Sequence, residues 1–173
     1  MKRFIIIIIL FFTTAQKNFA QNEDSSNANS LDAVIENLYK SISGPAGKDR
    51  DWNMFRLLFA NEARMYIAVP NKDSGTVLRV ITPEQYIERN STRLADMGFT
   101  EKEIHRITDS YGAITHVFST YESHFINSNN EEETVRGINS IQFFLDGSRY
   151  YILTICWDAD PKNNPVPERY LNE

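Results

Sequence analysis

Residues 104–126 read IHRITDSYGAITHVFSTYESHFI, two strand-like runs on either side of Gly112. The residue pattern changes here to the period of two that is typical of strands. The two runs extend over Ile104 to Tyr111 and Ala113 to Ile126, and both are longer than most strands. A glycine inside such a pattern marks a bulge or a sharp bend. A sharply bent sheet closed by helices leaves a hollow, so this stretch predicts a conical fold built around a cavity.

Helical patterns precede these strands along the chain. Apolar residues at helical spacing predict a helix over Leu31 to Ile42, and a second helix begins near Asp49 or Asp51. A third begins at Thr82-Pro83-Glu84-Gln85, which can form a capping box, and ends at Gly98. The remaining strands are expected over residues 63–69, 76–81, 134–145 and 149–157. This order predicts an α+β fold, with helices on one face of a strongly curved antiparallel sheet that forms a cone.

The N-terminus has the pattern of a secretory signal peptide. Lys2 and Arg3 precede the uncharged apolar run Phe4 to Phe12, which is too short to span a membrane. We expect cleavage after Ala20, with Ala15 as the alternative, and no stable membrane insertion afterwards. The expected organisation is a signal peptide over 1–20, a disordered lead-in over 21–29, one domain over 30–158 and an irregular tail over 159–173. The protein is therefore expected to be exported, either periplasmic or secreted.

Charge and cysteine content exclude several classes of function. Cleavage would leave 15 basic and 23 acidic residues, a net charge of −8. A surface of that sign repels phosphate backbones, so nucleic acid is a poor partner. Cys156 is the only cysteine, so no disulfide can form within the chain.

The order of elements and the sequence Tyr111-Gly112-Ala113-Ile114-Thr115-His116-Val117-Phe118-Ser119-Thr120-Tyr121-Glu122 resemble the nuclear-transport-factor-2-like superfamily, in particular its SnoaL-like branch. The closing hairpin, from Arg136-Gly137-Ile138-Asn139-Ser140 to Trp157-Asp158, adds to the resemblance. It covers Leu31 to Asp158 and implies a cone-shaped domain with a pocket, which often dimerises across its sheet. It implies no reaction, because members of the superfamily differ widely in function.

Metal and nucleophile sites have little support in the sequence. His116 and His124 share a strand face but lie about 26 Å apart at 3.3 Å per residue, and His105 lies before Gly112. No HxH, HExxH or cysteine-rich spacing is present, so we predict neither a metal nor a cofactor. Cys156 lies on an apolar strand, where a thiol usually packs.

General acid–base chemistry is the best case for an enzyme. His116, Glu122 and Arg136 lie on one face of neighbouring strands, and inside an apolar cone their pKa values would be shifted. The alternative is an exposed face on which Glu122 pairs with Arg136, which we prefer because surface pairs are common. Residues of the other parity, such as Tyr121, are then the candidates to line the pocket.

The closing hairpin suggests both a ligand site and a dimer. If Asp146-Gly147 is a two-residue turn, Asn139 pairs near Thr154 and Arg136 near Trp157. Both hairpin faces are then largely apolar, which favours a homodimer through the sheet over a face covered by the tail. We expect the pocket wall to include Trp52, Phe55, Tyr66, Tyr121, Asn139 and Trp157.

Three functions remain open at this point. The preferred one is an exported domain that binds a small, mostly apolar ligand in a conical pocket. The first alternative is an acid–base isomerase, dehydratase or hydrolase that uses the same pocket. The second is a dimerising interaction domain without a ligand.

Overall fold

The computed structural model describes residues 28–71, 73, 75–159 and 165–171. The predicted signal peptide and most of the predicted lead-in lie outside these residues. Ala28, at the end of the predicted lead-in, is buried, and its carbonyl oxygen accepts a hydrogen bond from the amide of Tyr150. No helix within the described residues is long and apolar enough to cross a membrane.

Three helices begin where their capping residues predict. Helix α2 (Leu31–Ile42) is capped by Ser30, and α3 (Trp52–Leu57) by Asp51. Helix α4 (Pro83–Asp96) starts with the predicted capping box, in which Thr82 and Gln85 bond each other's backbone amides.

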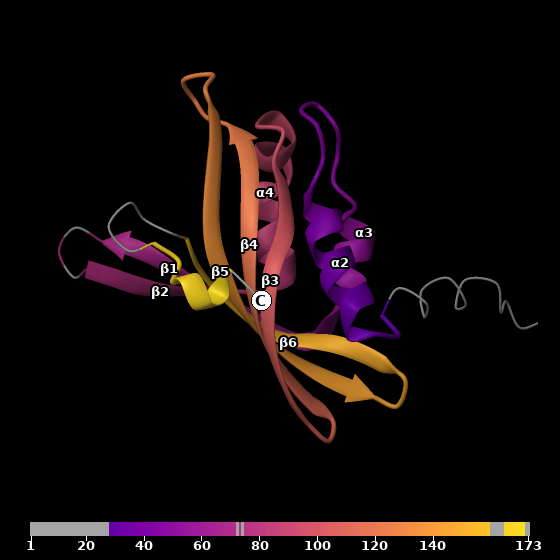
Figure 1. Ribbon diagram of the computed structural model, residues 1–173. Coiled ribbons are helices and arrows are strands. Elements are labelled where there is room, and N and C mark those ends of the chain that lie inside the picture. Colours follow the sequence, from indigo (N-terminus) through magenta and orange to yellow (C-terminus); the bar gives the residue numbers. More distant parts are fainter. Residues whose placement is uncertain (1–27, 72, 74, 160–164, 172–173) are drawn as a thin grey trace, which may run out of the picture.

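Six strands form one strongly twisted sheet in the order β2-β1-β6-β5-β4-β3, with the helices packed on one side of it (Figure 1). The strands are β1 (Phe59–Asn71), β2 (Gly75–Ile81), β3 (Thr100–Tyr111), β4 (Ile114–Ile126), β5 (Glu132–Asp146) and β6 (Arg149–Ala159). All neighbours are antiparallel except β1 and β6, which are parallel. The predicted α+β cone is confirmed.

Gly112 does not bend a continuous strand. It has a φ of +58° and forms a tight turn with Ala113, so that Tyr111 pairs with Ile114 and β3 folds back on β4. The ladders instead change register between Glu103 and His105 in β3 and between Gln142 and Phe143 in β5. Such irregularities increase the local twist and bend of a sheet.

The core fills one end of the cone. Val117, Ile141 and Ile152 on the inner face of the sheet are fully buried, and Val34 and Ile35 of α2 belong to the same cluster. The opposite end, under α4 and β2, contains a cavity.

Arg50 joins the ends of two helices. Its side chain is almost fully buried. The guanidinium donates to the carbonyl oxygens of Ile42, at 3.0 Å, and Gly44, at 2.7 Å, at the end of α2. It also donates to the carbonyl oxygen of Leu94 in α4, at 2.5 Å. The last carbonyls of a helix lack partners within the helix and carry its negative dipole end. One cation therefore fixes α2 against α4 beside the cavity.

The described end of the C-terminal tail, residues 165–171, reaches the outer face of the sheet. It contains a short 3-10 helix, η1 (Glu168–Tyr170), where the sequence predicted irregular structure. Thr120 Oγ1 donates to the Tyr170 carbonyl oxygen at 2.7 Å, and the rings of Phe118 and Tyr170 are 5.1 Å apart. The tail thus covers part of the face for which the sequence suggested a partner subunit.

Candidate functional site

A cavity of about 620 Å³ lies between the inner face of the sheet and the helices. Its wall is mostly apolar, with contributions from α2, α3, α4 and every strand. The apolar side chains that carry most of this wall are Leu38, Phe55, Ile67, Leu94, Phe99, Phe125, Ile155 and Trp157.

Strand alternation decides which side chains reach the cavity. On β4, Tyr121 and Phe125 line it, while Val117, Ser119 and Ser123 of the same parity are buried. The opposite set, which includes His116 and Glu122, therefore faces away. The odd-numbered residues of β4, the second of the two predicted linings, form the inner face.

The predicted pairing of the closing hairpin is wrong. The turn is Gly147-Ser148, because Asp146 pairs with Arg149, and a register shift leaves Leu153 between the pairs Phe143–Ile152 and Gln142–Thr154. An extra residue reverses the alternation of every residue beyond it. Trp157 consequently pairs with Asn139 and lies on the same face, inside the cavity.

Four of the six predicted ligand residues line the cavity: Phe55, Tyr121, Asn139 and Trp157. Trp52 lies outside the lining and packs edge-on against Phe55 and Tyr86, with ring centroids 5.7 and 6.4 Å away. Tyr66 has the opposite parity to Met65 and Ile67, which line the cavity, and it points to the outer face. Whether the four residues bind a ligand stays a prediction.

The three residues considered for acid–base chemistry all lie outside the cavity. Glu122 pairs with Arg136 at 2.9 Å and with Lys102 at 3.3 Å on the outer face. The hydrogen bond from Arg136 lowers the pKa of the Glu122 carboxyl. His116 instead bonds Ser140 through Nε2 at 3.0 Å. The surface ion pair that we preferred is thus present, and these residues do not converge on a common substrate position.

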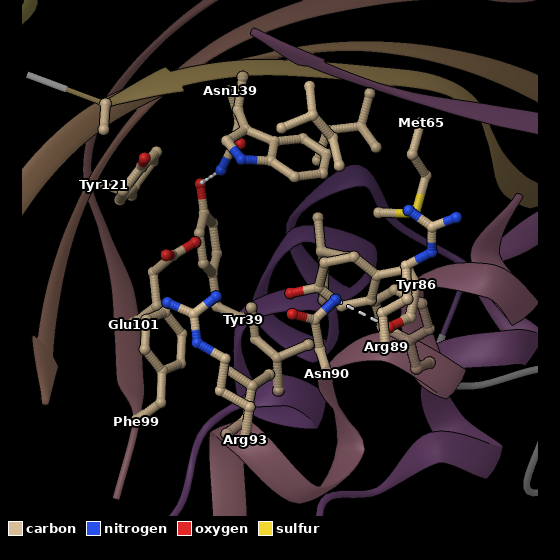
Figure 2. A pocket seen from close by; sticks show the side chains of 18 of the residues that line it. Tyr39, Met65, Tyr86, Arg89, Asn90, Arg93, Phe99, Glu101, Tyr121 and Asn139 are labelled. Atoms are coloured by element: carbon tan, nitrogen blue, oxygen red, sulfur yellow. Dashed lines mark hydrogen bonds between the residues drawn. The ribbon is translucent and has the colours of Figure 1, made fainter. Parts of the chain in front are cut away.

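Polar groups meet at one position on the cavity wall (Figure 2). Asn139 Nδ2 donates to Tyr39 Oη at 3.0 Å, and Tyr39 Oη lies 2.7 Å from Ser119 Oγ. Ser119 Oγ donates to Glu103 Oε1 at 2.5 Å. Because the Ser119 proton is directed at Glu103, the Tyr39 hydroxyl donates to Ser119. This chain of hydrogen bonds through Tyr39 and Ser119 holds the Asn139 amide in place on the cavity wall.

Among the lining residues that the structure describes, Glu101 is the only one with an acidic side chain, and Figure 2 shows it beside the Asn139 and Tyr39 group. Burial raises its pKa to about 8, and the Asn139 side chain opposes part of that rise. At pH 7 the group is therefore mainly a neutral carboxylic acid that can donate a hydrogen bond. Burial also raises the pKa values of Tyr39, Tyr86 and Tyr121, so these phenols stay neutral too.

Three arginines complete the lining at its exposed edge: Arg79 on β2, and Arg89 and Arg93 on α4. The sequence analysis missed them and Glu101. Arg89 and Arg93 are one helical turn apart, and they follow Tyr86 and precede Met97 at helical spacing, so the spacing held a usable signal. Glu101 had none, because Thr100-Glu101-Lys102-Glu103 reads as a solvated segment.

Among the described residues, no three or more His, Cys, Asp or Glu side chains are grouped as a metal site would require. Cys156 is exposed on the outer side of β6, where burial of its sulfur and the charge of Asp158 raise the pKa of the thiol. The thiol is therefore not activated as a nucleophile.

Comparison with known proteins identifies the fold. No family model and no curated protein matches the sequence. A solved structure of a nuclear transport factor 2 (NTF2-like) superfamily protein from Salmonella enterica matches with a TM-score of 0.56 and 15% identity, over 86% of this chain and 95% of that one.

Two further solved structures have the same architecture. The CaMKII hub of S. rosetta matches with a TM-score of 0.56 and 13% identity, over 76% of this chain and 95% of the hub. Hexachlorocyclohexane dehydrochlorinase LinA-type3 from Novosphingobium barchaimii matches with a TM-score of 0.55 and 8% identity, over 74% and 82%. At such identities the likeness concerns the fold alone. The chain has the nuclear-transport-factor-2-like fold that its sequence resembles.

Proposed function

We propose that the protein is an exported domain that binds a small, mostly apolar molecule in its conical cavity. The observation that carries the proposal is the cavity itself, about 620 Å³ with a largely apolar wall and a few convergent polar groups. Binding pockets for small molecules have this size and this composition. The proposal of export rests on the sequence of residues 1–20. It predicts that the mature protein begins at Gln21, and the mass of the secreted chain tests this prediction.

The binding test combines native mass spectrometry with a thermal-shift screen of hydrophobic metabolites. A ligand should raise the Tm, and Ile67→Trp, which adds bulk inside the cavity, should abolish that rise. Leu78→Trp is the matched control, because Leu78 is exposed on the neighbouring strand and does not line the cavity. No ligand in either assay, or equal effects of the two substitutions, would contradict the proposal.

An acid–base enzyme is the second candidate, and Glu101 is the observation that favours it. A carboxyl group with a pKa of about 8 can exchange a proton near neutral pH. Asn139, Tyr39 and Tyr121 offer neutral hydrogen-bonding groups on the same wall. If a bound molecule is also turned over, Glu101→Gln should stop turnover and leave binding intact, and unchanged turnover would remove this candidate.

Self-association through the outer face of the sheet is proposed as well. Ile107, Tyr111, Ile114 and Phe144 are exposed on this face or at its tip, beyond the part covered by η1, and we call them the outer apolar patch. A patch of large apolar side chains on a soluble protein is typical of an interface. The structural similarity to a CaMKII hub supports an assembly of copies.

A further inference from the structure

The arginines of this protein divide into two groups. Ten of them lie in the described residues, and seven donate at least one hydrogen bond there: Arg50, Arg56, Arg64, Arg106, Arg136, Arg149 and Arg169. Within the same part of the chain the side chains of the other three, Arg79, Arg89 and Arg93, make neither a hydrogen bond nor an ion pair. All three line the cavity.

The positions of the three bring their charges to one edge of the cavity. Arg89 and Arg93 are four residues apart on α4, so their charges repel each other along one helix face. Arg79 approaches the same cavity from β2, which pairs with β1 at Ile67. In Figure 2, Arg93 points from α4 into the pocket.

Among the described residues of the lining, no negative charge offsets these cations at neutral pH. Glu101 is the only acid among those residues, and burial keeps it largely protonated with a pKa of about 8. The cavity edge is therefore cationic although the whole chain has a net charge of −5. A local potential opposite in sign to that of the whole molecule attracts an anion into this cavity.

We propose that the ligand carries an anionic group, such as a carboxylate or sulfonate, which binds Arg79, Arg89 and Arg93 while its apolar body occupies the wall. The inference rests on the proposed binding function and specifies its ligand class. A guanidinium presents several donors in a plane and binds such oxyanions in pairs of parallel hydrogen bonds. An amphiphile of this class satisfies the three unpaired cations and the apolar wall with one molecule.

A matched pair of fluorescent probes tests the proposal. 8-Anilinonaphthalene-1-sulfonate and N-phenyl-1-naphthylamine have the same aromatic body, and only the first carries a negative charge. We expect wild-type protein to bind the sulfonate at least about tenfold more tightly than the neutral amine. The double variant Arg89→Gln/Arg93→Gln should lose most of that preference and keep its affinity for the neutral amine. Both arginines are exposed, so the variant should fold.

Arg136→Gln/Arg169→Gln is the control, since it removes the same charge from exposed outer positions. It should leave the preference for the sulfonate unchanged, and Ile67→Trp should weaken both probes. Equal affinity for the two probes, or equal loss in both arginine variants, would overturn the anionic ligand class and leave the proposed binding function standing. If neither probe binds, or Ile67→Trp affects neither, the ligand class and the proposed function fail together.

Discussion

Glu101 is the residue at which the cavity should be most sensitive to pH. Its pKa is raised from 4.5 to about 8 by folding, so between these values the folded protein binds more protons than the unfolded chain. Stability linked to this group is therefore fully present below about pH 4.5 and is lost as the pH rises through about 8. Glu101→Gln removes the titration without changing the size of the side chain.

We expect the Tm of Glu101→Gln, relative to wild type, to rise by about 10 °C between pH 5 and pH 9, as a loss of a few kcal/mol implies for a domain of this size. Differential scanning calorimetry at intervals of one pH unit measures the change. Glu122→Gln is the control. The pKa of the Glu122 carboxyl is lowered in the folded protein, so the stability linked to that group is lost as the pH falls and not as it rises. A constant Tm difference for Glu101→Gln across the range would show that Glu101 is not a buried neutral acid.

At the scale of single elements, β5 depends on one glycine. A Cβ atom at Gly137 would overlap the Tyr121 side chain and the carbonyl oxygen of Asp158. Gly137 pairs with Tyr121 across the ladder, so the missing side chain leaves the space in which the Tyr121 ring lies against the cavity wall. We expect Gly137→Ala to lower the free energy of unfolding by about 1–3 kcal/mol, the usual cost of overpacking.

Urea unfolding measures this change, and a crystal structure reports any displacement of the Tyr121 ring. Gln142→Ala, at an exposed position on the same strand, should change stability little. If Gly137→Ala is as stable as Gln142→Ala, the close approach of Tyr121 to β5 is not required by the fold.

The elements also show what the sequence could and could not predict. Thr82, Pro83 and Gln85 are local signals, and α4 begins where they place it. The unpaired Leu153 has no local signal, because a bulge depends on how two strands pair and not on either strand alone. The extra residue places Trp157 on the inner face. The predicted alternation of inner and outer residues along β6 is therefore right before Leu153 and wrong after it.

The sequence predicted aromatic residues of the candidate site and one amide, Asn139, but none of its charged residues. Phe55, Tyr121 and Trp157 are large rings on predicted elements, and such rings are usually buried. Arg79 and Glu101 come to the same cavity from β2 and β3, at opposite edges of the sheet. Their approach results from the closure of the cone, which no spacing along the chain records.

For the molecule as a whole, the outer apolar patch predicts self-association. We expect wild-type protein to form dimers at micromolar concentrations and Ile114→Asp/Phe144→Asp to be monomeric, because the charges would have to be buried in the interface. Light scattering coupled to size exclusion measures the mass of each. Leu78→Asp is the control, since Leu78 is equally exposed outside the patch. A monomeric wild type at high concentration would contradict the interface.

The parallel pairing of β1 with β6 dictates when this polypeptide can fold. Outside its own hairpin with β2, strand β1 pairs only with β6, where Phe59 pairs with Ile152 and Ile67 with Trp157, so the β1–β2 hairpin has no sheet to join until nearly the whole chain has been synthesised. In a nascent chain that stops short of β6, the β1–β2 hairpin cannot pair with the rest of the sheet. Because folding is completed late, the chain can pass unfolded through a narrow translocation pore. The proposed export requires this unfolded state.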